Sequence, residues 1–128
     1  MKRLTLLTIL VLSLLSTPVF ADWTKVGENA NGDFYVDFER IIKHDGYVYF
    51  WVLLDYLKPD KLGDLSSKNY HQGDCKLMGL KFLSSSRHKE PMGGGTGDVE
   101  EPVKKGWRYP PPNSSIEHIL KSVCAYAK

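Results

Sequence analysis

The sequence predicts an α+β fold: a β-sheet with one C-terminal α-helix packed on one of its faces and tethered to it by a disulfide. Three observations predict this fold. Stretches rich in β-branched and aromatic residues occupy much of residues 22–83, one stretch with helical periodicity closes the chain, and the chain contains only two cysteines, Cys75 and Cys124. We therefore expect a single domain over residues 22–128.

The first 21 residues have the composition of an export signal. Lys2 and Arg3 precede an apolar run over residues 4–15, and a small-x-small cleavage sequence follows at residues 19–21. The run is shorter than a bilayer-spanning helix requires, so we expect cleavage after Ala21 rather than a retained anchor. Export places the chain in an oxidising compartment, where its single pair of cysteines is expected to form a disulfide.

Size and charge narrow the possible functions of the mature chain. Removal of 21 of the 128 residues leaves 107, enough for one compact domain. The whole chain has 17 basic and 15 acidic side chains, so loss of Lys2 and Arg3 makes the two counts equal. Nucleic-acid binding needs clustered cations, and we therefore expect no nucleic-acid partner. No second apolar stretch of spanning length follows, so we expect no membrane span after cleavage.

Alternating polarity predicts the strands of the first half. Residues 22–27 alternate ahead of a turn cluster at 29–32, and the alternation over 34–39 indicates a half-buried strand. Asp45-Gly46 is the strongest hairpin signal in the chain. The run 47–57 that follows is apolar or aromatic on both faces, which is typical of a central strand.

The second half is predicted to be less regular. We expect a polar connection at 59–67, one strand within 68–83, a mobile loop of low hydrophobicity at 84–102, and a last strand over 103–109. The strand within 68–83 is expected to carry Cys75.

One convincing helix follows the three prolines at 110–112. Ser114 and Glu117 match a capping box, in which each side chain satisfies a backbone donor of the other residue. The apolar positions then fall in one stripe at helical spacing. These positions are Ile116, Ile119, Leu120, Val123 and Cys124. Because the helix must bury this stripe, a bridge from Cys124 to Cys75 would pin the helix across the sheet.

Other roles for these residues are weaker. His71 and Cys75, with His118 and Cys124, could supply four zinc ligands, but His118 and Cys124 point about 120° apart on a helix. The glycine run 93–97 lacks the Lys-Ser/Thr ending of a phosphate loop. The chain has no Gly-x-Ser-x-Gly elbow and no His-Glu-x-x-His sequence. We therefore expect no enzyme activity, metal or cofactor.

Two sets of residues are candidates for binding. The first is aromatic: Tyr47, Tyr49 and Trp51 share one face of the predicted central strand. Since one helix covers only one face of a sheet, the opposite face needs another cover, and half-exposed aromatic side chains suit an interface. The second set is basic and is predicted to form a lip around the glycine run. Its members are Arg87, His88, Lys89, Lys104 and Lys105.

Taken together, these elements resemble the surface-adhesin protein E family of small exported bacterial proteins. The resemblance is carried by short segments in a characteristic order over nearly all of residues 22–128. These segments are Trp23, Tyr35-Val36-Asp37, Trp51-Val52-Leu53-Leu54-Asp55-Tyr56, Ser67-Lys68, Asp74-Cys75-Lys76, Trp107 ahead of the Pro/Ser turn, and Val123-Cys124. The resemblance implies an antiparallel sheet whose concave face holds the helix through the Cys75–Cys124 bridge.

The resemblance also implies a function: a non-enzymatic, adhesin-like module that contacts a protein partner through its sheet face and loops. The partner would be a host extracellular protein or a second copy of the chain. The family's namesake is a lipid-anchored adhesin with which haem binding is associated, but the present signal has no cysteine to lipidate. We therefore expect a periplasmic or secreted protein. The alternatives are a periplasmic accessory or inhibitor protein, and a haem or small-molecule carrier using His71, His88 and tyrosines.

Overall fold

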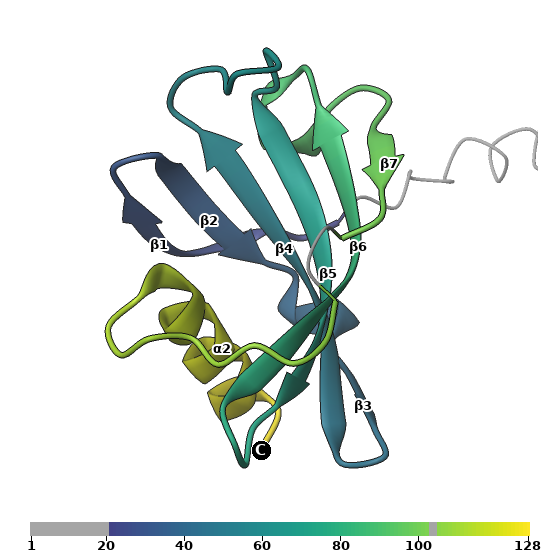
Figure 1. The fold of residues 1–128 in the computed structure, drawn as a ribbon, viewed down its shortest axis with the longest axis vertical. Helices are drawn as coiled ribbons and strands as arrows, with labels where there is room; N and C mark the ends of the chain where they lie inside the picture. Colours follow the sequence, from purple (N-terminus) through teal and green to yellow (C-terminus); the bar gives the residue numbers. More distant parts are fainter. Residues whose placement is uncertain (1–20, 103–104) are drawn as a thin grey trace, which may run out of the picture.

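Over residues 21–102 and 105–128, the computed structural model of the chain forms a seven-stranded antiparallel sheet and a C-terminal helix (Figure 1). The strands are β1 (Thr24–Asn29), β2 (Gly32–Val36), β3 (Ile42–His44), β4 (Tyr47–Tyr56), β5 (Ser66–Asp74), β6 (Gly79–His88) and β7 (Asp98–Glu100). They lie in the order β1-β2-β4-β5-β6-β7, and β3 pairs with the first residues of β4. The helical segments are η1 (Phe38–Arg40), η2 (Pro91–Gly93) and α2 (Ser115–Tyr126).

This architecture confirms the predicted fold class. Helix α2 packs against one face of the sheet, over β1, β2 and β4 (Figure 1). Among the described residues, no helix is both long and apolar enough to cross a membrane. The predicted export signal, apart from Ala21, lies outside the described residues.

The predicted hairpin and central strand are confirmed. Asp45 and Gly46 have φ angles of 51° and 81°, the left-handed values that a two-residue hairpin turn requires at both positions. The strand that follows, β4, pairs with β2, β3 and β5 and therefore lies inside the sheet. The strand predicted from the alternation over residues 34–39 ends at Val36, and residues 38–40 form the 3-10 helix η1 instead.

The prediction of a single strand within residues 68–83 is wrong. Strand β5 ends at Asp74, residues 75–78 form a turn, and β6 begins at Gly79. The Asp74 carboxylate closes this turn by accepting hydrogen bonds from the backbone N–H of Lys76 and Leu77, at 2.9 and 3.2 Å. The apolar residues in the turn conceal it in the sequence, and the turn, rather than a strand, carries Cys75.

Two further predictions for the second half are also corrected. Residues 84–88 continue β6, because β5 and β7 supply backbone partners on its two sides, and β7 lies within the predicted loop 84–102. In place of a last strand over 103–109, the described residues 105–109 make a single bridge, between Arg108 and Leu80. Val103 and Lys104 lie outside the described residues.

Helix α2 begins and packs largely as predicted. The Ser114 hydroxyl accepts a hydrogen bond from the Glu117 N–H at 3.3 Å. The Glu117 carboxylate accepts one from the N–H of Asn113 at 3.2 Å, one residue earlier than a capping box requires. The predicted stripe is confirmed: three of its members are buried and two are half-buried in the same core. Their sheet partners are Phe34, Val36, Val48, Phe50, Val52 and Leu80.

The disulfide joins the end of this helix to the sheet. Cys75 and Cys124 are bonded. Their Cα atoms are 5.7 Å apart, and the two residues are 49 positions apart in sequence. The pairing confirms the expected bridge. It overturns the zinc alternative, because neither sulfur is left as a thiolate to bind a metal.

His71 is an ionisable group buried in the helix-facing core, with 1% of its surface exposed. Its ring lies 5.3 Å from the ring of Phe50 and 4.4 Å from that of Phe82. Its Nδ1 has no hydrogen-bond partner among the described residues. Burial lowers the pKa of His71 from 6.5 to about 3, so the imidazole is neutral in the folded protein at physiological pH.

The first prediction concerns the disulfide. Replacing both cysteines by serine is expected to lower the free energy of unfolding by about 4 kcal/mol, the chain-entropy value for a loop of this length. Urea unfolding of the two proteins measures this difference. The unmodified protein should show no reactive thiol under denaturing, non-reducing conditions, and a count of two would contradict the bridge.

The second prediction compares two positions on α2. Ile119 is 2% exposed in the core, whereas Lys121 is exposed and pairs with Glu117. Ile119→Asp is expected to prevent folding, because it buries an unpaired charge, and Lys121→Asp to cost about 1 kcal/mol or less. Thermal unfolding measures both, and equal midpoints would show that the helix face is assigned wrongly.

The third prediction uses the low pKa of His71. Between pH 6.5 and about 3, the unfolded chain binds a proton at this position and the folded chain does not. Its contribution to stability is therefore complete above pH 6.5 and is lost as the pH falls, with a slope of at most about 1.4 kcal/mol per pH unit. Denaturant unfolding from pH 7 to pH 4 should show that His71→Leu has a shallower loss than the unmodified protein. Parallel curves would contradict this assignment.

Candidate functional site

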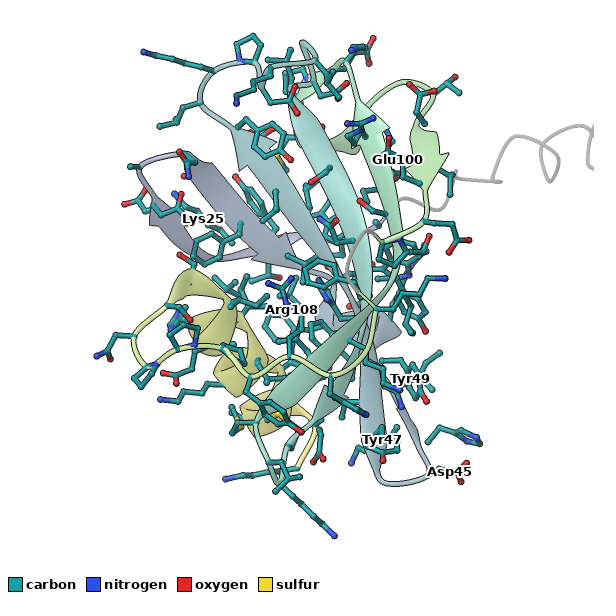
Figure 2. All side chains as sticks on the ribbon, in the orientation of Figure 1. Lys25, Asp45, Tyr47, Tyr49, Glu100 and Arg108 are labelled. Carbon is teal, nitrogen blue, oxygen red and sulfur yellow. A yellow bond between two sulfur atoms is a disulfide. The ribbon has the colours of Figure 1, made fainter. Side chains whose placement is uncertain are left out.

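The side chains of β4 divide between the two faces of the sheet. Val48, Phe50 and Val52 point to the α2 side and are buried in its core. The intervening residues, Tyr47, Tyr49 and Trp51, point to the opposite side and are only half-buried. Figure 2 labels Tyr47 and Tyr49 near the β3–β4 hairpin, away from helix α2. The three aromatic residues predicted to lie together therefore do share the face that the helix leaves free.

Two further aromatic residues join them. The ring of Tyr70 on β5 lies 4.7 Å from that of Trp51, in a stacked arrangement, and 6.4 Å from that of Tyr49. The ring of Trp107 lies 5.3 Å from that of Tyr47. We call these five half-buried residues the aromatic face: Tyr47, Tyr49, Trp51, Tyr70 and Trp107. Burial, together with the nearby Tyr49, raises the pKa of Tyr70 above its usual value of 10.0, so its hydroxyl keeps its proton.

Polar and apolar groups border the aromatic face. The Lys81 ammonium lies 4.9 Å from the centre of the Trp107 ring, a cation–π contact. Gln72 is the register partner of both Tyr49 and Lys81. On the other side, Ile42 of β3 is paired with Tyr49 and is 55% exposed. The result is an aromatic centre with a mixed edge, which is the composition of many protein interfaces.

Beyond Trp51, part of this side of the sheet is covered by the chain itself. Leu53, two residues after Trp51, is fully buried beneath residues 89–97, which we call the cover segment. Gly93 of this segment has a φ of 68° and lies so close to Lys68 that an added Cβ would be 2.3 Å from the Lys68 Cε. The Lys68 side chain could move to relieve this contact, but the left-handed φ itself favours glycine at this position.

Side chains from the sheet hold the cover segment in place. Asp55 accepts a hydrogen bond from the Met92 N–H at 2.8 Å. The Ser66 hydroxyl donates to the Glu90 carbonyl at 2.6 Å and accepts from the Gly93 N–H at 2.8 Å. Because these anchors lie at one end of the sheet, the cover closes that end and the aromatic face remains open at the other.

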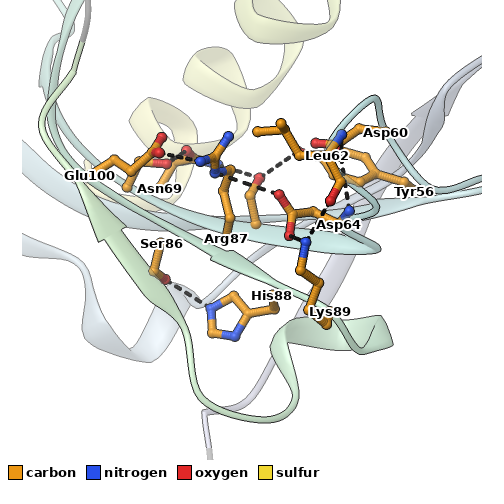
Figure 3. A network of polar contacts seen from close by, with 12 residues as sticks. Tyr56, Asp60, Leu62, Asp64, Asn69, Ser86, Arg87, His88, Lys89 and Glu100 are labelled. Atoms are coloured by element: carbon orange, nitrogen blue, oxygen red, sulfur yellow. Dashed lines mark hydrogen bonds and ion pairs between the residues drawn. The ribbon is translucent and has the colours of Figure 1, made fainter.

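The predicted basic residues do not gather as free cations around the glycine run. Arg87 pairs with Asp64, at 3.5 Å, and with Glu100, and Lys89 pairs with the same Asp64 at 3.0 Å. The Asp64 side chain is buried, and Figure 3 shows both cations directed at it. These pairs attach the loop between β4 and β5 to β6, through Arg87, and to the first residue of the cover segment, through Lys89. The binding role predicted for Arg87 and Lys89 stays a prediction, with their charges already compensated within the chain.

The other members of the basic set are separated from these two. His88 is buried, with one ring nitrogen 2.9 Å from the Ser86 hydroxyl and the other 3.1 Å from the Gly94 carbonyl. Lys105 is exposed, and Lys104 lies outside the described residues. The binding roles of these three residues also stay predictions.

The histidines proposed for a carrier role do not converge. His71 points into the α2 side of the sheet, whereas His88 lies under the cover segment on the other side. No group of three or more His, Cys, Asp or Glu residues within the described ranges could hold a metal ion. Two members of the aromatic face, Tyr70 and Trp107, are not among the binding residues predicted from the sequence. Tyr70 could have been found from the sequence, because Lys68, Tyr70 and Gln72 occupy alternate positions, which lie on the same face of a strand.

Comparisons with known proteins give one consistent result. The family model for surface-adhesin protein E matches residues 23–125. A crystal structure of Haemophilus influenzae protein E, crystal form II, is 21% identical, covers 88% of this chain and 95% of that chain, and has a TM-score of 0.66. Protein E from non-typeable Haemophilus influenzae is 19% identical, covers 86% and 80%, and has a TM-score of 0.61. A search of curated proteins gives no match.

The two kinds of comparison establish different things. At these identities the solved structures show a shared fold. The family match extends over every strand and all but the last residue of helix α2. The chain therefore belongs to the surface-adhesin protein E family and is an adhesin-like binding module.

Proposed function

We propose that this protein is exported and binds a host extracellular protein through its aromatic face. The observation that carries the proposal is the placement of five half-buried aromatic side chains on the open part of the sheet. Family membership supports the adhesin role, and the expected signal over residues 1–21 supports export. Beyond family membership, this proposal names the kind of partner and the residues that contact it.

The aromatic face suits protein binding for energetic reasons. Large aromatic side chains bury 150–250 Å² each and dominate the binding energy of many interfaces. Here Trp51 and Tyr70 are stacked on each other, and Tyr47 and Trp107 are in contact. Because these rings already support one another in the free protein, they lose little conformational entropy when a partner covers them. The hydroxyls of the tyrosines can donate hydrogen bonds at the wet edge of such a contact.

We assign no catalytic role to any residue. Catalysis would require a nucleophile or general base within reach of a substrate. The imidazole of His71 is enclosed by Phe50 and Phe82, and both nitrogens of His88 are engaged in hydrogen bonds. The functional chemistry that we propose is therefore non-covalent recognition.

The fourth prediction tests the contact surface. With the mature protein over a layer of solubilised host extracellular matrix, Tyr49→Ala and Trp51→Ala are each expected to weaken binding at least tenfold, as for central aromatic residues of interfaces. Surface plasmon resonance measures the change. Tyr126→Ala is the matched control, because Tyr126 is an exposed aromatic residue on α2 that contacts Phe38 and lies outside the aromatic face.

Light scattering over a wide concentration range must accompany this test. A mass of two chains that falls to one in Trp51→Ala, with matrix binding unchanged, would assign the aromatic face to self-association and contradict the proposal. Equal binding by Trp51→Ala and the unmodified protein, or an equal loss in Tyr126→Ala, would also contradict it.

A further inference from the structure

A groove on the α2 side of the sheet is separate from the aromatic face. It lies between helix α2, the sheet, and the segment 105–114 that leads to the helix, which we call the strap. Its volume is about 330 Å³. Six apolar side chains line it: Phe34, Leu54, Leu80, Phe82, Ile116 and Ile119. Arg108 to Pro111 of the strap form one of its walls. Figure 2 labels Arg108 between α2 and the strands.

The groove is held open by the backbone. The N–H of Arg108 donates to the Leu80 carbonyl at 2.8 Å, and the Leu80 N–H donates to the Arg108 carbonyl at 2.9 Å. At the other end of the strap, the Ser114 hydroxyl donates to the Pro111 carbonyl at 2.7 Å. The prolines between them have fixed φ angles, so the strap has little freedom to collapse onto the sheet. The groove is therefore a preformed feature, as most ligand sites are.

The electrostatics of the groove favour an anion. Among the described residues, Arg108 is the one charged side chain that lines it. Its guanidinium carbon lies 5.8 Å from the Phe82 ring centre, and no carboxylate of the described residues is within 4.0 Å of its nitrogens. Glu100 and Glu101 line a neighbouring hollow that shares Phe82 and Arg108 with the groove, and Glu100 is already paired with Arg87. A guanidinium without a carboxylate partner, beside an apolar surface, can bind a carboxylate by donating two parallel hydrogen bonds to its oxygens.

The remaining polar groups of the groove are neutral. Asn29 donates a hydrogen bond to the Ser115 hydroxyl at 3.1 Å, which closes a polar contact between the β1–β2 turn and α2. A ligand therefore meets an apolar floor and a single cation, and the groove volume is at the lower end of the range for ligand pockets, about 300–1,000 Å³.

We propose that this groove is a binding site for a small apolar acid, a free molecule with one carboxylate or sulfonate and a hydrocarbon or aromatic body. The anionic group would pair with Arg108, and the body would pack on Phe82, Leu80 and Ile116. The site is on the opposite side of the sheet from the aromatic face, so the proposal stands independently of the proposed protein partner.

A pair of matched fluorescent probes tests the proposal. 8-Anilinonaphthalene-1-sulfonate is an apolar anion, and N-phenyl-1-naphthylamine is nearly the same molecule without the sulfonate. Each is titrated into the mature, disulfide-bonded protein and into Arg108→Gln. The variant is expected to bind the anion at least tenfold more weakly and the neutral probe within twofold of the unmodified protein, because only the charge contact is removed. Lys61→Gln, which removes an exposed lysine outside the groove, should leave both affinities unchanged.

The location of the bound probe completes the test. In ¹⁵N–¹H spectra, the anion should shift the amides of Leu80, Phe82, Ile116 and Ile119 in the unmodified protein. Circular dichroism checks that Arg108→Gln is folded, which we expect because the arginine is exposed. Unchanged affinity for the anion in Arg108→Gln, equal weakening of both probes, or amide shifts confined to the aromatic face would overturn the proposal.

Discussion

Strand β4 carries apolar or aromatic side chains on both of its faces, and a single helix covers only one of them. Most of the remaining structure follows from this imbalance. On one side, α2 seals Val48, Phe50 and Val52 into the core. On the other side, the cover segment buries Leu53 but stops short of Trp51. The aromatic face lies on this side of the sheet, next to the part that the cover segment buries, and its residues are of types that tolerate partial exposure to water.

The two coverings are attached by different chemistry. Helix α2 is held by burial of its apolar stripe and by the covalent bridge between Cys124 and Cys75, in a turn at the end of the sheet. The cover segment has little apolar surface, and polar side chains of the sheet hold it through the backbone groups of residues 90–94. Net stabilisation by a hydrogen bond is about 1 kcal/mol, so the cover depends on several acting together. Anchored in this way, both coverings leave the aromatic face open and in a fixed position.

Local patterns were enough to predict the elements whose stability is local. Two adjacent positions with left-handed backbone define the β3–β4 hairpin, the run over residues 47–57 defines the central strand, and the apolar stripe defines α2. The bridge followed because the chain has only two cysteines. The turn at 75–78 was missed because the Asp74 side chain, rather than glycine or proline, closes it. The serine-rich part of β6 was missed because neighbouring strands, rather than side-chain propensity, make it a strand.

The candidate site could be predicted only in part, for the same reason. Tyr47, Tyr49 and Trp51 lie on one strand, but Tyr70 and Trp107 reach them from distant positions. Hydroxyl-radical footprinting of the protein, free and bound to extracellular matrix, tests the central claim most directly, because it reports the solvent exposure of individual side chains. The account predicts protection of Tyr47, Tyr49, Trp51, Tyr70 and Trp107, with Tyr109 and Tyr126 unchanged. Protection of Tyr109 and Tyr126, with the aromatic face still oxidised, would contradict it.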